Sequence, residues 1–227
     1  MQNIKKKCHA INLKLQNSKL QFQSFGNVSL RIDEKNFVIK PSGINVKKTK
    51  FYDFPVVNID SKKSIGKLKP SSDTLTHLEI YKNFRNIRSI VHTHSKYAVI
   101  WSQSNKSIPN LGTTHADYWL NEIPITSNLK NSEIKKNYET NIGKKIVEKL
   151  RKIKNNVEMC PGILVQSHGP FAWGLNHEDG YKNAERLELI AELAFKSLLI
   201  NKNIKMDKSL IKKHFFRKHG KDRYYGQ

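Results

Sequence analysis

Apolar residues follow two different spacings near the start of the chain. Over residues 3–22 they recur at near-helical spacing, which predicts an amphipathic first helix. Over residues 30–32 and 37–39 they alternate with polar residues, and a polar turn at 33–36 lies between. Alternation places every second side chain on one face of a strand, so this segment is predicted to form two short strands joined by a tight turn.

The remaining chain mixes the same two patterns. It predicts a second hairpin over 54–60 and 65–68, a helix starting near 75, a strand over 90–94, a short helix over 97–101, a surface helix over 131–153, a strand over 162–165 and a long helix over 184–199. Strands and helices therefore occur together along most of the sequence.

Length and cysteine content restrict the class of protein. A chain of 227 residues can bury one substantial core and is short for two ordinary domains, so a single domain over 1–227 is expected. Cys8 and Cys160 imply no disulfide framework and favour a cytoplasmic setting. The basic amino terminus lacks the apolar block of a signal peptide, and no apolar run approaches the ~18 residues of a membrane span, so no membrane partner is expected.

The net charge of +22 raises the alternative of a polyanion-binding protein, held on nucleic acid by phosphate contacts. The basic clusters are spread over 5–7, 47–50, 62–69, 144–154 and 212–221. They form no single dense tract and carry no interleaved aromatic platform. We therefore expect no nucleic-acid partner, and our hypothesis is that the charge reflects a drift toward Lys, Asn and Ile.

Candidate metal chemistry begins with His92 and His94, which follow apolar Ile90 and Val91. On a strand, residues two apart share one face and lie ~6.6 Å apart. Nine histidines in this chain would give about 0.4 such pairs by chance, so the pair alone is a weak motif. A third histidine, His168, stands in a glycine-containing turn after the apolar run at 162–165. Three protein ligands with a fourth position open are typical of a catalytic zinc.

Six short segments extend this pattern. They are PSSDT at 70–74, IVHTHS at 90–95, IPNLGTTHADY at 108–118, SHGPFAWG at 167–174, RKHG at 217–220 and YYGQ at 224–227. In this order they resemble the L-ribulose-5-phosphate 4-epimerases of the class II aldolase and adducin family. The resemblance covers the chain from about Gly26 to its last residue. Phe25 departs from the tryptophan common in the family, and the segment 177–180 is less typical and is assigned no role.

The resemblance implies an α/β fold with three layers, α/β/α, in which helices cover a central, mostly antiparallel sheet. It also implies a homotetramer with active sites at the subunit interfaces, acting on a small-molecule sugar phosphate. The tail at 212–227 is rich in aromatic residues, and such a chain end needs a surface to bury against. By resemblance, this tail reaches a neighbouring subunit's active site.

The same resemblance implies a zinc site, or a site for another divalent metal, with His92, His94 and His168 as ligands. Asp73 matches a position of the metal site, as a weak ligand or as a partner of the ligands. Residues implied in a phosphate pocket are Gly26, Asn27, Lys40, Ser42, Gly43, Ser71 and Ser72. Read alone, these are also ordinary turn residues, and 71–73 is also a helix cap whose free amides would attract an anion.

By resemblance, Asp117, expected next to the cation site, and Tyr225, brought by the tail, match the family's acid/base pair, with His214 of the tail assisting. Because the C4 proton of a 2-ketose phosphate is not next to the carbonyl, inversion at C4 requires cleavage of the C3–C4 bond, which a bound metal assists as a Lewis acid. The implied function is a zinc-dependent epimerase interconverting L-ribulose 5-phosphate and D-xylulose 5-phosphate. Glu139 matches a glutamate near the site, whereas His115 is expected only to brace its loop.

Two alternatives remain. A sister class II sugar-phosphate aldolase would share the three histidines, and product analysis separates the two enzymes. An adducin-like protein would use the fold for binding without catalysis. The joint presence of the three histidines with Asp117 and Tyr225 argues against the adducin-like alternative.

Overall fold

A seven-stranded sheet forms the centre of the molecule. The structure, a computed structural model, describes residues 1–21, 23–153, 157–221 and 223–225. Within these residues the strand order is β4-β3-β2-β1-β5-β7-β6, and every neighbouring pair is antiparallel. The strands are β1 (Asn27–Arg31), β2 (Asn36–Ile39), β3 (Val56–Asn58), β4 (Ser64–Ile65), β5 (Ser89–His92), β6 (Gly162–Val165) and β7 (Gly169–Gly174).

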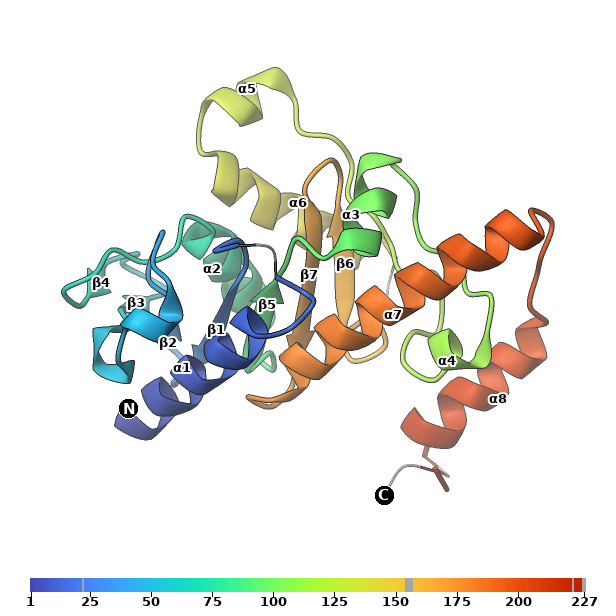
Figure 1. Cartoon of the computed structure of the whole chain (residues 1–227), viewed down its shortest axis with the longest axis horizontal. Helices are drawn as coiled ribbons and strands as arrows, with labels where there is room; N and C mark the ends of the chain where they lie inside the picture. The colour runs from blue at the N-terminus through green and yellow to red at the C-terminus, as the bar shows by residue number, and fades with distance from the viewer. Residues whose placement is uncertain (22, 154–156, 222, 226–227) are drawn as a thin grey trace.

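Helices cover both faces of this sheet (Figure 1). They are α1 (Gln2–Gln16), α2 (Thr74–Asn83), α3 (Lys96–Gln103), α4 (Thr113–Ala116), α5 (Asn131–Lys135), α6 (Tyr138–Lys152), α7 (Asp179–Ile200) and α8 (Lys208–His219), with short 3-10 turns at Val46–Lys48 and Phe51–Asp53. None of the described helices combines the length and apolar character needed to cross a bilayer. The predicted α/β class and central antiparallel sheet are confirmed.

Alternation along β1 explains the layers. Val28 and Leu30 are fully buried in one cluster with Cys8 of α1. Ser29 points to the opposite face, where its hydroxyl lies 2.7 Å from Nδ1 of His77 on α2. Because successive strand residues face opposite sides, one short strand can bind α1 on one face and α2 on the other.

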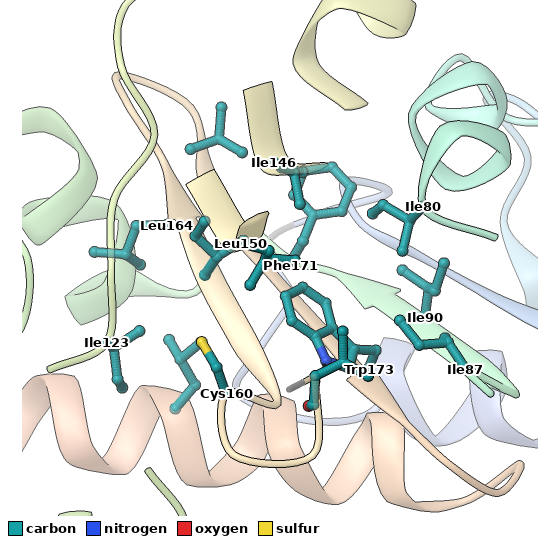
Figure 2. Packing of buried hydrophobic residues seen from close by; sticks show 14 of the residues in the cluster. Ile80, Ile87, Ile90, Ile123, Ile146, Leu150, Cys160, Leu164, Phe171 and Trp173 are labelled. Carbon is teal, nitrogen blue, oxygen red and sulfur yellow. Dashed lines mark hydrogen bonds between the residues drawn. The ribbon is translucent and has the colours of Figure 1, made fainter. Parts of the chain in front are cut away.

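The larger core lies among the sheet, α2, α6 and α7 (Figure 2). Phe171 and Trp173 of β7 and Ile90 of β5 meet Ile146 and Leu150 of α6, and each of these side chains is at most 1% exposed. Burial of five large apolar side chains contributes about 1.5–3 kcal/mol each. This core makes β5 and β7 a rigid support for the side chains at their ends.

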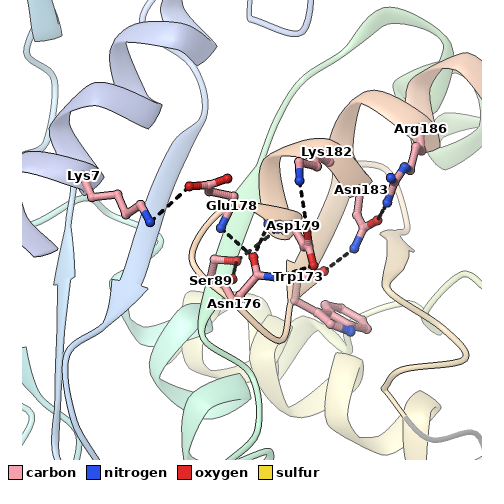
Figure 3. A network of polar contacts seen from close by, with 10 residues as sticks. Lys7, Ser89, Trp173, Asn176, Glu178, Asp179, Lys182, Asn183 and Arg186 are labelled. Carbon is pink, nitrogen blue, oxygen red and sulfur yellow. Dashed lines mark hydrogen bonds and ion pairs between the residues drawn. The ribbon is translucent and has the colours of Figure 1, made fainter. Parts of the chain in front are cut away.

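The first turn of α7 is tied to β5 by a polar network (Figure 3). The Asn176 side-chain oxygen accepts hydrogen bonds from the backbone N–H of Glu178 and Asp179, both at 2.9 Å. The Ser89 hydroxyl donates to the Asn176 carbonyl at 2.6 Å and accepts from the Gly180 N–H at 3.1 Å. The atypical segment at 177–180 therefore serves as a helix start.

Several predicted boundaries were wrong. The first helix ends at Gln16, short of Phe22, which lies outside the described residues. The predicted helix over 131–153 is two helices, because Asn137 adopts a left-handed conformation with φ 57°. The strand predicted to carry both His92 and His94 ends at His92. Strand β7 and helices α4 and α8 were not predicted.

Candidate active site

Three imidazoles converge at one end of β5 and β7. His92 is the last residue of β5, His94 lies in the connection to α3, and His168 lies in the turn between β6 and β7. Nε2 of His92 lies 3.1 Å from Nε2 of His94 and 3.1 Å from Nε2 of His168. Their candidate ligand atoms all lie within 4.8 Å of one another. Three imidazole nitrogens converging in this way fit a divalent cation such as zinc.

The His92 ring is held on both sides. It stacks on Phe171 with a centroid distance of 4.2 Å and an interplanar angle of 17°. Its Nδ1 lies 3.0 Å from the Pro170 carbonyl oxygen, which can only accept a hydrogen bond. Nδ1 therefore carries the proton, and Nε2 presents its lone pair to the other two rings.

The turn that carries His168 packs closely on the segment after β5. Ser167 has φ 56°, a left-handed conformation that turns the chain sharply. A Cβ atom on Gly169 would lie 2.7 Å from the Thr93 carbonyl oxygen, closer than side chains allow. Glycine is therefore required for the turn to approach residue 93, and this approach brings His168 to His92 and His94.

Burial keeps the rings of His94 and His168 neutral. It lowers the pKa of His94 to about 4, and the neighbouring His92 ring adds to this effect. Burial and the same neighbour lower the pKa of His168 to about 3. At neutral pH both rings therefore have a lone pair available for a cation.

Asp73 lies beside this group of histidines. Among the described residues it is not one of the converging ligand atoms, and its carboxylate accepts a hydrogen bond of 2.7 Å from the Asn27 amide. Burial alone would raise the pKa of Asp73, but the His92, His77 and His168 rings and the Asn27 amide outweigh it and lower the pKa. The carboxylate is therefore ionised beside the candidate cation site.

Most of the residues assigned to a phosphate pocket meet at one corner of the sheet. Pro41 and Pro70 form an isolated bridge that places the segment 40–43 alongside 69–72. The Ser71 N–H donates to the Lys40 carbonyl at 3.0 Å, and the Ser42 N–H donates to the Lys69 carbonyl at 2.9 Å. These bonds bring Lys40, Ser42, Gly43, Ser71 and Ser72 together.

Lys40 supplies a charge at this corner. Its side chain is buried, and its Nζ donates to the Ser24 carbonyl at 3.2 Å. Burial lowers the pKa of Lys40, and the Asp73 carboxylate opposes this effect. An ammonium group with so few partners is suited to an anionic ligand.

Gly26 and Asn27 connect this corner to the metal candidates. Gly26 has φ 93°, and a Cβ atom there would lie 2.8 Å from the His92 carbonyl oxygen. A side chain at position 26 would therefore clash with the strand that carries His92. Asn27 is paired with His92 in the sheet and bonds Asp73.

Asp117, His214 and Tyr225 form a separate group. Asp117 accepts from Nδ1 of His214 at 3.0 Å and from Arg217 at 3.0 Å. Tyr225 lies over the Arg217 guanidinium at 4.3 Å. Burial alone would raise the pKa of Asp117, but hydrogen bonds from His214, Arg217 and Lys218 outweigh it and lower the pKa.

This second group lies apart from the histidines in the same chain, so within one chain Asp117 does not lie next to the cation site as expected, because its carboxylate is bound to α8 instead. Figure 1 shows α4 and α8 together beside the C-terminal half of α7, away from the top of β5 and β7. Phe215 anchors α8 and is fully buried, whereas Tyr224 and Tyr225 are exposed. Residues 226 and 227 of the tail lie outside the described residues.

Three further residues named in the sequence analysis, His115, Glu139 and Phe25, have contacts within the chain. His115 is buried, and its Nε2 lies 3.0 Å from the Asn121 carbonyl, so it braces its loop as expected. The Glu139 carbonyl accepts from Thr76 at 2.7 Å. Phe25 lies against His94 with ring centroids 5.5 Å apart.

Sequence reasoning missed Tyr138, whose hydroxyl lies 3.3 Å from Nδ1 of His168. Tyr138 lies on the apolar side of the helix predicted over 131–153, so the apolar spacing does not indicate a contact with His168.

Solved structures of sugar-phosphate aldolases resemble this fold. An L-fuculose 1-phosphate aldolase has a TM-score of 0.77 at 20% identity, covering 93% of this chain and 94% of its own. The L-fuculose-1-phosphate aldolase of Thermus thermophilus has a TM-score of 0.69 at 20% identity, with 89% and 99% coverage. A sugar-phosphate aldolase of Thermotoga maritima has a TM-score of 0.68 at 19% identity, with 91% and 98% coverage.

The family itself is identified by a sequence model. The class II aldolase and adducin N-terminal domain model matches residues 6–195, which include the three converging histidines and Asp117. With this match over most of its length, the chain belongs to the class II aldolase and adducin family.

Proposed function

We propose that this protein is a metal-dependent L-ribulose-5-phosphate 4-epimerase, which interconverts L-ribulose 5-phosphate and D-xylulose 5-phosphate. The observation that carries the proposal is the convergence of His92, His94 and His168 beside the corner that holds Lys40 and Ser71. The carbonyl end of a five-carbon sugar phosphate requires a cation, and its phosphate end requires a site that binds an anion. The family membership supports an enzyme of this superfamily.

The residues at the phosphate corner would anchor the substrate. Lys40 supplies a positive charge, and Ser71 and Ser72 stand at the start of α2, where free amides and the helix dipole favour an anion. Gly43 is exposed with open space around it, so its backbone is accessible to a phosphate, whereas Gly26 and Asn27 are buried and would act by holding the adjoining chain in place. This anchor would keep the phosphate-bearing fragment in place while its aldehyde turns to present the other face.

The three histidines would hold a divalent cation, zinc being our proposal, with Asp73 acting as an outer carboxylate. When bound, the cation supplies Lewis acidity, which polarises the substrate carbonyl and stabilises the negative charge left by cleavage of the C3–C4 bond. Asp73 would contribute by orienting Asn27 and by adding negative charge beside the histidines.

Asp117 and Tyr225 would move the protons. One of them takes the proton from the C4 hydroxyl as the C3–C4 bond breaks, and the other returns a proton to the C4 oxygen after attack on the opposite face. His214 would assist through its 3.0 Å contact with Asp117. Because this group lies apart from the histidines of its own chain, we propose that a neighbouring subunit of a homotetramer supplies it.

A class II aldolase is the second candidate, favoured by the names of the similar structures. The test is to incubate the zinc-loaded protein with L-ribulose 5-phosphate and to identify the products. The epimerase converts it to D-xylulose 5-phosphate. An aldolase that cleaves C3–C4 without rejoining the fragments accumulates dihydroxyacetone and glycolaldehyde phosphate, and this outcome would contradict the proposal.

Our hypothesis about the charge is also testable. Weak binding of duplex DNA at physiological salt is expected, whereas tight binding with a steep salt dependence would favour a polyanion-binding protein.

A further inference from the structure

The outer nitrogen of His168 faces a tyrosine. Nε2 of His168 points at His92, at 3.1 Å, so Nδ1 points away from the converging nitrogens. The Tyr138 hydroxyl oxygen lies 3.3 Å from this Nδ1. The two rings are nearly parallel, with an interplanar angle of 11° and centroids 6.4 Å apart. The Tyr138 ring is therefore nearly parallel to the His168 ring, and its hydroxyl is directed at the nitrogen that points away from the other two histidines.

Outer contacts of this kind decide which nitrogen of an imidazole is free. A neutral ring carries one proton, and a partner that accepts it at one nitrogen leaves a lone pair at the other. For His92 the partner is the backbone carbonyl of Pro170. In the part of the chain that the structure describes, Tyr138 is the one side chain that hydrogen-bonds an outer nitrogen of the three histidines.

The helix start that carries Tyr138 is fixed in place. Asn137 adopts φ 57° and turns the chain from α5 into α6. The Asn141 amide then donates to the carbonyls of Glu133 at 2.9 Å and Lys136 at 2.8 Å, which closes this corner. Tyr138 is thus the first residue of α6, and the turn at Asn137 and the Asn141 hydrogen bonds fix the start of this helix.

The same helix is attached to α2, whose N-terminal end lies at the candidate site. The Thr76 hydroxyl donates to the Glu139 carbonyl at 2.7 Å, one residue after Tyr138. Gly143 lets the helices approach closely, because a Cβ atom there would lie 2.6 Å from Cβ of Glu79. Asp73, at the N-cap of α2, and Tyr138 therefore sit on two helices packed as one unit.

We propose that Tyr138 is a positioning residue for the metal centre: its hydroxyl oxygen accepts the Nδ1–H of His168, which keeps Nε2 of His168 unprotonated and directed at the cation. This inference rests on the proposed metal site and deepens it. Tyr138 touches neither the cation nor the reacting atoms. Its effect passes through the tautomer and the orientation of His168.

The test is the variant Tyr138→Phe, which removes the hydroxyl and keeps the ring. Tyr138 is 37% exposed, so the substitution opens no core cavity. The dissociation constant for Zn²⁺ of the full chain is measured by competition with a chelator. We expect it to rise about 10–100-fold, as is typical when a ligand loses its outer partner. The matched control is Tyr52→Phe, which alters another exposed tyrosine, one on a 3-10 turn, and should leave the constant unchanged.

Two further measurements separate positioning from folding. The thermal midpoint of the metal-free protein should be the same in Tyr138→Phe as in the wild type. In the zinc-loaded wild type the Nδ1–H proton of His168 should be detectable by NMR of nitrogen-15-labelled histidine, and it should exchange faster with water in the variant. Unchanged zinc affinity, or a loss of affinity matched by a loss of metal-free stability, would overturn the proposal.

The outcome is distinguishable from failure of the proposed epimerase, because no sugar phosphate is used. A wild type that binds zinc but does not epimerise, together with weakened binding in Tyr138→Phe, would overturn the epimerase alone. An active epimerase whose Tyr138→Phe variant binds zinc normally would overturn the positioning role alone. A wild type that binds no divalent cation would overturn both.

Discussion

His92 connects the core of the protein to its candidate chemistry. One face of its ring stacks on Phe171, a fully buried core residue, and its Nδ1 is fixed by the Pro170 carbonyl. Its remaining nitrogen has little freedom, so it is already directed at the other two imidazoles. A site held in this way would bind a cation at a smaller cost for ordering the His92 side chain.

At the residue scale, we expect His94→Ala to abolish metal binding at neutral pH. The variant removes one of three converging nitrogens, and because loss of an outer partner alone costs roughly 10–100-fold, the dissociation constant for Zn²⁺ should rise by more than about 100-fold. Metal content after dialysis and turnover of L-ribulose 5-phosphate measure this. His177→Ala, at the start of α7, is the control, and undiminished turnover in His94→Ala would contradict the metal assignment.

His77 gives a prediction for acid stability. It is fully buried, and burial lowers its pKa from 6.5 to about 3. Above pH 6.5 the His77 ring is neutral in both the folded and the unfolded state, so the stability that depends on a neutral ring is fully present. As the pH falls from 6.5 toward 3, the unfolded chain takes up a proton that the folded chain cannot, so the free energy of unfolding decreases by up to about 1.4 kcal/mol per pH unit.

His77→Gln should remove this contribution to the pH dependence of the free energy of unfolding. Urea unfolding at a series of pH values from about 7 down to about 4 should show a flatter profile for the variant than for the wild type. Parallel profiles would mean that other groups, such as His94 and His168, account for the acid sensitivity.

At the element scale, α3 depends on a residue of another helix. Its N-cap, Ser95, makes no side-chain capping bond. Instead, the Glu188 carboxylate of α7 accepts from the N–H groups of Tyr97 at 2.8 Å and Ala98 at 2.9 Å. This contact fixes the first turn of α3, which begins two residues after His94.

Glu188→Ala should therefore destabilise the fold. Two amides of a partly buried helix start lose a charged acceptor, and we expect the free energy of unfolding to fall by about 1–3 kcal/mol. Urea unfolding measures this. The matched control is Glu185→Ala, an exposed glutamate on the same helix, and an equal effect of the two substitutions would show that the cap contributes little.

At the scale of the whole molecule, the two groups of candidate residues lie in different places. The histidines lie at the end of β5 and β7, whereas Tyr225 and Asp117 lie at α8 and α4. A single chain therefore carries both halves of the proposed site, but in different places. In the proposed homotetramer, the histidines of one subunit would meet Asp117 and Tyr225 of a neighbouring subunit.

This arrangement predicts complementation between two inactive variants. His94→Ala lacks a cation ligand, and Tyr225→Phe lacks an acid/base hydroxyl. If each site takes its histidines from one subunit and its tyrosine from the next, co-assembly at equal amounts should restore about one quarter of the sites. Turnover of L-ribulose 5-phosphate by the co-expressed pair measures this. No recovery in mixed oligomers would show that the site is built within one chain.

Much of the fold could be predicted from local patterns. The predicted strand segments at 30–32 and 37–39 fall largely in neighbouring strands, α2 starts near residue 75 and α3 lies near 97–101, because their apolar periodicity matches the face that they bury. Helix α7 ends near its predicted end but begins at Asp179, before the predicted residue 184. Strand β7 was missed because its glycine and proline residues are typical of turns, and only pairing with β5 and β6 makes it a strand. The break at Asn137 was missed because the apolar spacing continues across it.

The sequence alone determined the residue types of the candidate chemistry and much of the element order. Only the tertiary structure decided which residues meet. The contact between His168 and His92 joins residues 76 positions apart, and it depends on how closely Gly169 packs on residue 93. The contact between Tyr138 and His168 depends on the packing of α6 on α2. Local periodicity encodes which face of an element is buried, whereas contacts between distant elements depend on packing that no local pattern contains.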